Sequence, residues 1–186
     1  MQVIDVDIFA CVNAFEYAHP DSKSQSLALI DFGAVDTTIA ILNKGTVTFS
    51  RDIAFGGNDL TEMIQRKLNL QREEALKLQL NLGVATAEQL AIMYGVLERL
   101  YQEITSSLNY YYSQHQNAAP IDCLYISGGF SELSFLAETL EKSAQIPVKK
   151  WDPLRPFTLG QKLTAEELKT LSPFLPVSIG LALRSK

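Results

Sequence analysis

The chain has 186 residues, of which 47% are hydrophobic and 20% charged, and its formal net charge is −5. This balance is typical of a folded globular protein, and the negative charge argues against a broad basic face for nucleic acid. We therefore expect no nucleic-acid partner. No apolar run reaches the ~18 residues of a membrane-spanning helix, so we expect no direct membrane insertion either.

The start of the chain differs in character from the rest. A helix is predicted over residues 3–17, with an apolar face formed by Ile4, Ile8, Phe9, Val12 and Phe15. Residues 19–26 follow as a polar stretch typical of a linker. Because a helix and a linker look like the tail of a preceding element, we expect residues 1–26 to connect to a missing first domain. Residues 27–186 would then form the domain itself.

Three strands with tight connections are predicted next. They cover residues 27–32, 37–42 and 46–50, joined by the turns Gly33-Ala34-Val35-Asp36 and Asn43-Lys44-Gly45. Such short connections favour antiparallel pairing. A further extended piece, residues 52–55, leads into Gly56-Gly57.

Helices dominate the second part of the chain. They are predicted over residues 58–68 (with Asn58 or Asp59 as the N-cap), 71–80, 86–116, 131–143 and 177–183. The longest has an apolar stripe at Leu90, Met93, Leu97, Tyr101, Ile104, Leu108 and Tyr111. Strands are predicted over residues 121–127 and 147–150, and residues 151–158 form an irregular loop. Strand hairpins followed by strand–helix units indicate a layered α/β or α+β domain.

The first glycine turn with a chemical interpretation joins Asp31, at a strand end, to Gly33 and Thr37. A carboxylate beside a glycine turn and a hydroxyl can face a metal-bound phosphate, with Asp31 reaching Mg²⁺ through water. The alternative is a plain β-turn with a surface aspartate.

Two glycine pairs precede predicted helices. The N-terminal amides of the helix after Gly56-Gly57 would attract an anion. Gly128-Gly129, followed by Phe130, would let a flat ring or a phosphate approach the backbone. Each pair could instead form an ordinary tight turn.

Other chemical signals are weaker. Glu74 and Lys77 are three residues apart on a predicted helix, so they could grip a sugar hydroxyl or form a solvated ion pair. The glycine spacings of the Rossmann and Walker A motifs are absent. A zinc site is not indicated, because neither His19 nor His115 has a cysteine or carboxylate at ligand spacing.

The order of these motifs resembles the second half of the actin-like ATPase superfamily, and most closely the PilM family of type IV pilus assembly proteins with its MshI group. The resemblance rests on Asp31-Phe32-Gly33-Ala34 with Thr37, Ser50-Arg51-Asp52-Ile53 with Gly56-Gly57 and Leu60-Thr61, Glu74-Ala75-Leu76-Lys77, Ser127-Gly128-Gly129-Phe130-Ser131, and residues 176–184. It covers nearly the whole chain and is least clear over residues 151–172.

The resemblance implies an RNase H-like α/β domain with a five-stranded mixed sheet flanked by helices, and a small helical insertion at about residues 59–83. It also implies a site for ATP and Mg²⁺. Its residues would be Asp31, Gly33, Thr37, Gly56 and Gly57 near the phosphates and metal, Glu74 and Lys77 at the ribose, and Gly128, Gly129 and Phe130 at the adenosine. Because nothing before Asp31 supplies the other phosphate loop of the superfamily, we expect weak or no ATP binding by this half alone.

The resemblance further implies a non-catalytic adaptor of type IV pilus or MSHA-type pilus biogenesis, at the cytoplasmic face of the inner membrane. Cys11 and Cys123 in apolar stretches fit a reduced, cytoplasmic compartment. Expected partners are the short tail of a bitopic inner-membrane protein similar to PilN and the pilus motor platform, with self-association as a further expectation. The alternatives are an FtsA-like scaffold or filament protein, and a fragment of a sugar-kinase-like phosphotransferase. We expect ATP binding rather than efficient hydrolysis.

Overall fold

A computed structural model describes residues 4–80, 85–133, 135–158, 160 and 164–184 of the protein. Its strands are β1 (Ser26–Phe32), β2 (Thr37–Asn43), β3 (Thr46–Ile53), β4 (Cys123–Ser127) and β5 (Val148–Lys150). Its α-helices are α1 (Asp7–Ala18), α2 (Gly57–Leu68), α3 (Arg72–Leu80), α4 (Ala87–Gln114), α5 (Leu136–Ala144), α6 (Ala165–Leu171) and α7 (Pro176–Leu183). Short 3-10 helices are η1 (Pro20–Ser24), η3 (Gly129–Glu132) and η4 (Ser172–Phe174).

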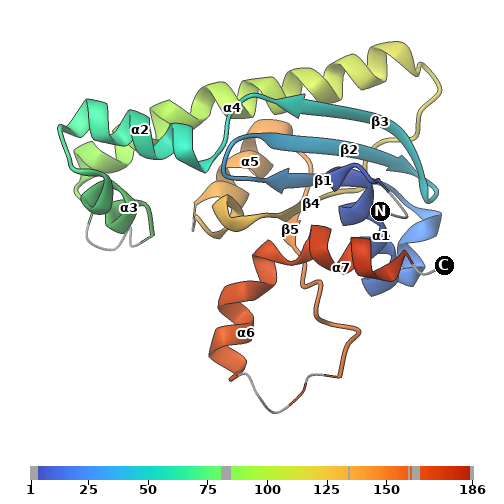
Figure 1. Ribbon diagram of the computed structural model, residues 1–186. Coiled ribbons are helices and arrows are strands. Elements are labelled where there is room, and N and C mark those ends of the chain that lie inside the picture. Colours follow the sequence, from blue (N-terminus) through green and yellow to red (C-terminus); the bar gives the residue numbers. More distant parts are fainter. Residues whose placement is uncertain (1–3, 81–84, 134, 159, 161–163, 185–186) are drawn as a thin grey trace.

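The five described strands form one mixed sheet in the order β3-β2-β1-β4-β5 (Figure 1). Strand β2 pairs antiparallel with β1 and β3, whereas β4 lies parallel to both β1 and β5. The predicted five-stranded mixed sheet is therefore confirmed. Lys44 and Gly45 have φ values of 52° and 75°, as a two-residue hairpin turn requires, and this turn sets the register of β2 against β3.

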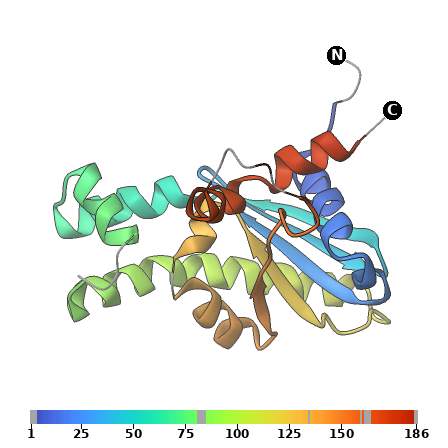
Figure 2. The ribbon, with the colours of Figure 1, turned by 90° about the horizontal axis from the view of Figure 1, so that it is seen from below.

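The sheet carries a hydrophobic layer on each face, because successive residues of a strand point to opposite sides. Along β1, Ala28 and Ile30 belong to the core beneath α4 and α5, whereas Leu27 and Leu29 belong to the core beneath α1. Figure 2 shows α4 and α5 on one face of the sheet and α1 and α7 on the other. The stripe predicted for α4 is buried except at Leu90, which is half-buried.

Helix α1 is part of the second of these cores. It packs along α7, where a Cβ atom at Gly180 would lie 1.7 Å from the carbonyl oxygen of Ala10. Phe15 is fully buried and packs edge-on against Trp151, which belongs to the same core. Of the residues expected on its apolar face, Ile4 lies before the start of α1 and is exposed, and Phe9 on the helix is exposed as well.

The stretch expected to be a linker is ordered as η1 and the start of β1. The hydroxyl of Ser22 donates to the carbonyl oxygen of His19 at 2.6 Å, and the ring of His19 stacks on that of Phe15 at 4.5 Å between centroids. That residues 1–26 lead from a preceding domain stays a prediction.

Several helix ends differ from the sequence predictions. The N-cap of α2 is Gly56 rather than Asn58 or Asp59, because the Asp59 carboxylate accepts a hydrogen bond from the Gly56 N–H at 2.9 Å. The helix expected from Ser131 is split into η3 and α5, since the Ser131 hydroxyl donates to the Gly128 carbonyl at 2.7 Å and closes a short turn. Helix α6 and η4 were not predicted. Figure 1 shows α2 and α3 together at one end of the molecule.

Candidate functional site

A cavity of about 310 Å³ lies where β1 and β4 end, next to the start of α2. Its lining residues come from distant parts of the sequence, between Asp31 and Val177. The lining residues are Asp31, Gly33, Ala34, Gly57, Asn58, Thr61, Leu76, Gln79, Gly128, Gly129, Phe130, Pro173, Phe174, Pro176 and Val177. The strand ends, the first glycine turn and both glycine pairs therefore meet at one place.

Asp31 is the acidic group of this cavity. It pairs in register with Ser127 across the parallel strands, and the Ser127 hydroxyl donates a hydrogen bond of 2.7 Å to the Asp31 carboxylate. Burial raises the pKa of Asp31, the negative charges of Asp36 and Asp7 add to that rise, and the hydrogen bond from Ser127 opposes it. Ionised Asp31 would thus gain from a nearby cation.

The turn after Asp31 is clamped by the start of α2. The N–H of Gly57 donates to the Gly33 carbonyl at 3.0 Å, and the N–H of Asn58 donates to the Ala34 carbonyl at 2.9 Å. A Cβ atom at Gly56 would lie 2.6 Å from the carbonyl oxygen of Ala34, so the turn and the helix meet only because this residue is glycine. The amides of Gly33, Gly56, Gly57 and Asn58 are thereby bonded within the protein.

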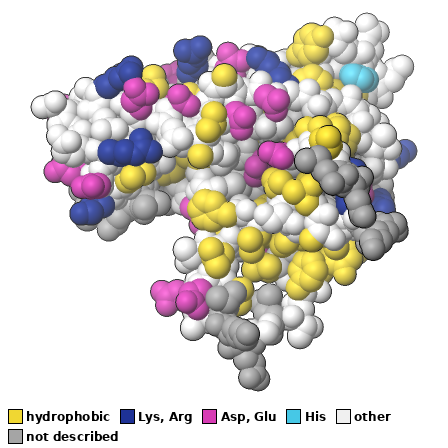
Figure 3. Space-filling model, viewed as in Figure 1, with side chains coloured by type: hydrophobic (Ala, Val, Ile, Leu, Met, Phe, Trp, Pro, Cys, Tyr) yellow, Lys and Arg dark blue, Asp and Glu magenta, His cyan; other side chains and the backbone are white. Residues whose placement is uncertain are grey.

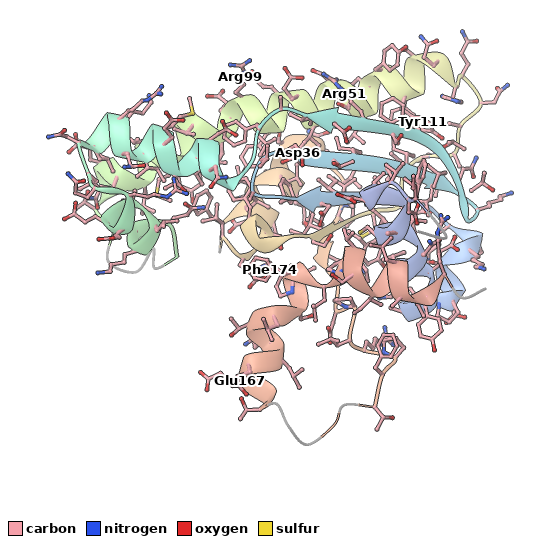
Figure 4. All side chains as sticks on the ribbon, in the orientation of Figure 1. Asp36, Arg51, Arg99, Tyr111, Glu167 and Phe174 are labelled. Carbon is pink, nitrogen blue, oxygen red and sulfur yellow. The ribbon has the colours of Figure 1, made fainter. Side chains whose placement is uncertain are left out.

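The second glycine pair forms the opposite wall. Gly128 has a φ of 87°, and a Cβ atom there would lie 2.2 Å from the carbonyl oxygen of Phe32. A Cβ atom at Gly129 would lie 2.2 Å from the ring of Phe174, which comes from η4 between α6 and α7 (Figure 4). The ring of Phe130 is buried and packs edge-on against Phe32, with centroids 5.7 Å apart. This wall is therefore bare backbone flanked by aromatic carbon.

Four of the predicted site residues, Thr37, Gly56, Glu74 and Lys77, do not line the cavity. The Thr37 hydroxyl donates to the Phe55 carbonyl at 2.8 Å and is buried. Glu74 and Lys77 are exposed on α3, and the Glu74 carboxylate accepts from the N–H of Gln71 at 2.9 Å. Their expected contacts with phosphate and ribose stay predictions.

Several residues that line the cavity were not assigned to the site from the sequence, among them Leu76, Gln79 and Phe174. Leu76 and Gln79 are the residues by which α3 reaches it, and Phe174 covers Gly129. Thr61 also lines it, and the Leu60-Thr61 pair was already part of the family resemblance. No sequence signal marked Gln79 or Phe174.

A second, acidic cavity of about 330 Å³ lies on the other side of Asp31. It is lined by Asp5, Val6, Asp7, Ile8, Asp31, Asp36, Thr38 and Asp52. The carboxylate of Asp5 forms an ion pair of 2.6 Å with Arg184. Among the residues that the structure describes, no three His, Cys, Asp or Glu side chains converge closely enough to hold a metal ion.

The residues that line the first cavity fit a nucleoside and a hydrated cation. Its glycine wall has room where a Cβ atom would stand, and its apolar lining suits a flat base. None of its described lining residues is a lysine or an arginine. A polyphosphate beside Asp31 would therefore require a divalent cation, which Asp31 could hold through water.

Comparison with known proteins gives the family context. A profile of the family described as "Type IV pilus assembly protein PilM" matches residues 1–186. A chain of the structure titled "PilM-PilN type IV pilus biogenesis complex" superimposes over 98% of this chain with a TM-score of 0.85 and 26% sequence identity. This chain covers 52% of that chain, so it spans about half the length of its relative.

More distant similarities share the fold or a segment of sequence. MreB5 of Spiroplasma citri bound to AMPPNP superimposes over 94% of this chain, with a TM-score of 0.64 and 15% identity, which is a likeness of fold alone. This chain covers 57% of that MreB5 chain. The cell division protein FtsA of Bacillus subtilis (strain 168) is 40% identical over 65 residues, which are 35% of this chain and 15% of FtsA. The actin-like fold predicted from the sequence is confirmed.

Proposed function

Because the chain belongs to the PilM family of type IV pilus assembly proteins, we propose that it acts as a non-catalytic adaptor in the biogenesis of a type IV or MSHA-type pilus. In this proposal it contributes half of a site for ATP and Mg²⁺. One observation carries the nucleotide assignment: Asp31 and the pair Gly128-Gly129 face one cavity from two adjacent parallel strands. A base would lie on the glycine wall, and Asp31 would hold a hydrated Mg²⁺ that neutralises the phosphates.

The proposed partner is the short cytoplasmic tail of a bitopic inner-membrane protein similar to PilN. The relative that superimposes over 98% of this chain comes from a structure titled as a PilM–PilN complex, which supports this assignment. The chain would work at the cytoplasmic face of the inner membrane, next to the pilus motor platform. Within the described residues, no helix is long and apolar enough to cross a membrane.

The exposed apolar side chains of the protein support a further contact. Apolar groups gather over α7 in Figure 3, and Phe174, Leu181 and Val6 are exposed on the elements η4 and α7 and just before α1. We propose that this face contacts the other half of an actin-like protein, with residues 1–26 leading from it. The nucleotide would then lie between the halves, and full affinity would require both.

Thermal unfolding with Mg²⁺ and ATP tests the nucleotide assignment. Because this chain supplies half of the site, we expect millimolar Mg²⁺-ATP to raise the midpoint of unfolding only slightly, and Asp31→Ala to abolish that rise. Asp21→Ala, which removes an exposed carboxylate on η1, serves as the matched control and should leave the rise intact. A rise that survives Asp31→Ala contradicts the placement of the cation, and no rise at all contradicts nucleotide binding by this chain.

Binding of the membrane partner calls for its own experiment. A synthetic peptide with the sequence of the PilN-like cytoplasmic tail should retain the protein on beads, and a scrambled peptide of equal charge should not. Equal retention by both peptides contradicts the partner assignment without touching the nucleotide site.

A second candidate function is a scaffold or filament protein related to FtsA. The 65 residues that are 40% identical to FtsA favour it. Sedimentation of the protein with Mg²⁺-ATP separates the two candidates, because a filament protein pellets in a concentration-dependent manner and an adaptor stays in the supernatant.

A further inference from the structure

Thr61 and Gln79 form a buried polar pair at the inner wall of the cavity. Thr61 is 1% exposed and Gln79 is 8% exposed, and both line the cavity from the neighbouring helices α2 and α3. The Thr61 hydroxyl oxygen lies 2.8 Å from the Gly57 carbonyl oxygen and 2.9 Å from Oε1 of Gln79. Both distances are within the hydrogen-bond range.

The number of protons decides how this pair is arranged. A hydroxyl has a single proton, so Thr61 can donate to only one of its two neighbours. The Gly57 carbonyl can only accept, and at 2.8 Å it takes that proton. The Gln79 amide must then donate an N–H to the Thr61 oxygen. Turning an amide by half a rotation exchanges its two ends at almost no change in shape, so the hydrogen bonds determine its orientation.

With its nitrogen bonded to Thr61, the amide of Gln79 presents its oxygen at its other end, toward the cavity. No hydrogen bond within the described residues reaches that end of the amide, and it is not among their fully buried polar atoms without a partner, so it keeps some accessible surface. Because Gln79 lines the cavity, that oxygen is available to accept a hydrogen bond from a group bound there. The cavity therefore offers one fixed acceptor on an otherwise apolar wall.

We propose that Gln79, held by Thr61, determines base specificity by accepting a hydrogen bond from the 6-amino group of adenine. This inference rests on the proposed nucleotide site. The base is the part of ATP that suits the surroundings of Gln79, where Leu76 and the Gly129 backbone form the apolar wall. The hydroxyls of the ribose are the other donors that a nucleotide offers. Inosine triphosphate has a keto oxygen in place of the amino group, so it would face Gln79 acceptor to acceptor.

Calorimetric titration of the full chain, in the presence of Mg²⁺, with ATP, ITP, 2′-deoxy-ATP and 3′-deoxy-ATP tests this inference. We expect ATP to bind about tenfold more tightly than ITP, and both deoxy analogues to bind like ATP. Equal binding of ATP and ITP, tighter binding of ITP, or a loss confined to a deoxy analogue overturns the role of Gln79. No binding of any of the four nucleotides overturns the proposed nucleotide site itself.

Variants locate the effect on the amide. Gln79→Met keeps the length of the side chain and should abolish the roughly tenfold preference for ATP, because it removes the hydrogen bond to ATP and relieves the acceptor–acceptor contact with ITP. Thr61→Ser, which keeps the hydroxyl, should retain the preference for ATP, and Thr61→Val should reduce it. Gln71→Met places the same substitution on an exposed position just before α3 and should change neither affinity. Circular dichroism shows which variants are folded, and a preference for ATP that survives in folded Gln79→Met contradicts the inference.

Discussion

The hydroxyl of Ser127 donates a hydrogen bond of 2.7 Å to the carboxylate of Asp31, and the two residues face each other in register at the ends of β4 and β1. On its other side, the Ser127 oxygen lies 3.7 Å from the sulfur of Cys11, whose pKa burial raises, so that it remains a neutral thiol. The Asp31 carboxylate therefore contacts the Ser127 hydroxyl, which in turn contacts the buried thiol of Cys11 on α1. Its only open direction among the described residues is toward the two cavities that it lines.

Asp31→Asn is expected to stabilise the protein while removing its response to Mg²⁺-ATP. The raised pKa means that ionised Asp31 costs stability: the cost is absent below the ordinary value of 3.8 and grows as the pH rises through the folded-state pKa. The asparagine oxygen can still accept from Ser127. At neutral pH we expect a gain of about 1 kcal/mol in chemical denaturation, shrinking to nothing in acid.

Ser127→Ala removes the hydrogen bond that the Asp31 carboxylate accepts. Loss of the hydrogen bond removes the influence that lowers the pKa of Asp31, so that pKa should rise further. NMR titration of the Asp31 carboxyl carbon measures it directly. An unchanged or lowered pKa in the variant contradicts the hydrogen bond as drawn.

The two glycines of the second pair should respond differently to alanine. Gly128→Ala forces a Cβ atom onto the Phe32 backbone at a φ of 87°, and we expect a loss of about 3 kcal/mol or more. Gly129→Ala meets only the ring of Phe174, which is 62% exposed and can turn away, so a loss of about 1 kcal/mol or less is expected. Urea denaturation compares the two, and equal losses would contradict the placement of Phe174.

The packing of α1 on α7 gives a second pair of glycine variants. Gly180→Ala places a Cβ atom 1.7 Å from the Ala10 carbonyl oxygen and should destabilise the protein by about 3 kcal/mol as the helices are pushed apart. Gly95→Ala on α4 has open space around the new methyl group and should stabilise by about 0.5–1 kcal/mol. If Gly180→Ala unfolds no more easily than the native chain, α1 does not pack on α7 in solution.

Local sequence patterns were sufficient to predict most of the fold. The β-branched runs and the Lys44-Gly45 turn determine the hairpin, and the spacing of three and four residues determines α4, because these signals act within one element. Helix α6 and η4 were missed, since residues 151–172 carry prolines and no long apolar period. The ends of helices depended on side chains such as Asp59, whose hydrogen-bond partner only the structure reveals.

The candidate site was predictable where it lies on turns and not where it depends on helix faces. Asp31 and both glycine pairs are marked in the sequence because turns restrict residue type. Helix α3 could present either Glu74 and Lys77 or Leu76 and Gln79 to the cavity, and local sequence does not decide between two faces of a short helix. Its packing against α2 turns the second pair inward.

The pH dependence of stability should report on His19, which is half-buried against the ring of Phe15. Burial lowers the pKa of His19, the hydrogen bond of its Nδ1 to the Phe15 carbonyl opposes this, and the positive charge of Arg155 lowers it slightly more. Below the ordinary value of 6.5 the unfolded chain therefore binds a proton that the folded protein resists, so stability falls as the pH drops toward the folded-state pKa. His19→Phe keeps an aromatic ring on Phe15 and removes the group that takes up the proton. In urea denaturation between about pH 7 and pH 5, this variant should lose less stability as the pH falls than the native chain does, and Arg155→Gln should lose an intermediate amount. A slope identical to that of the native chain in His19→Phe contradicts the buried position of this histidine.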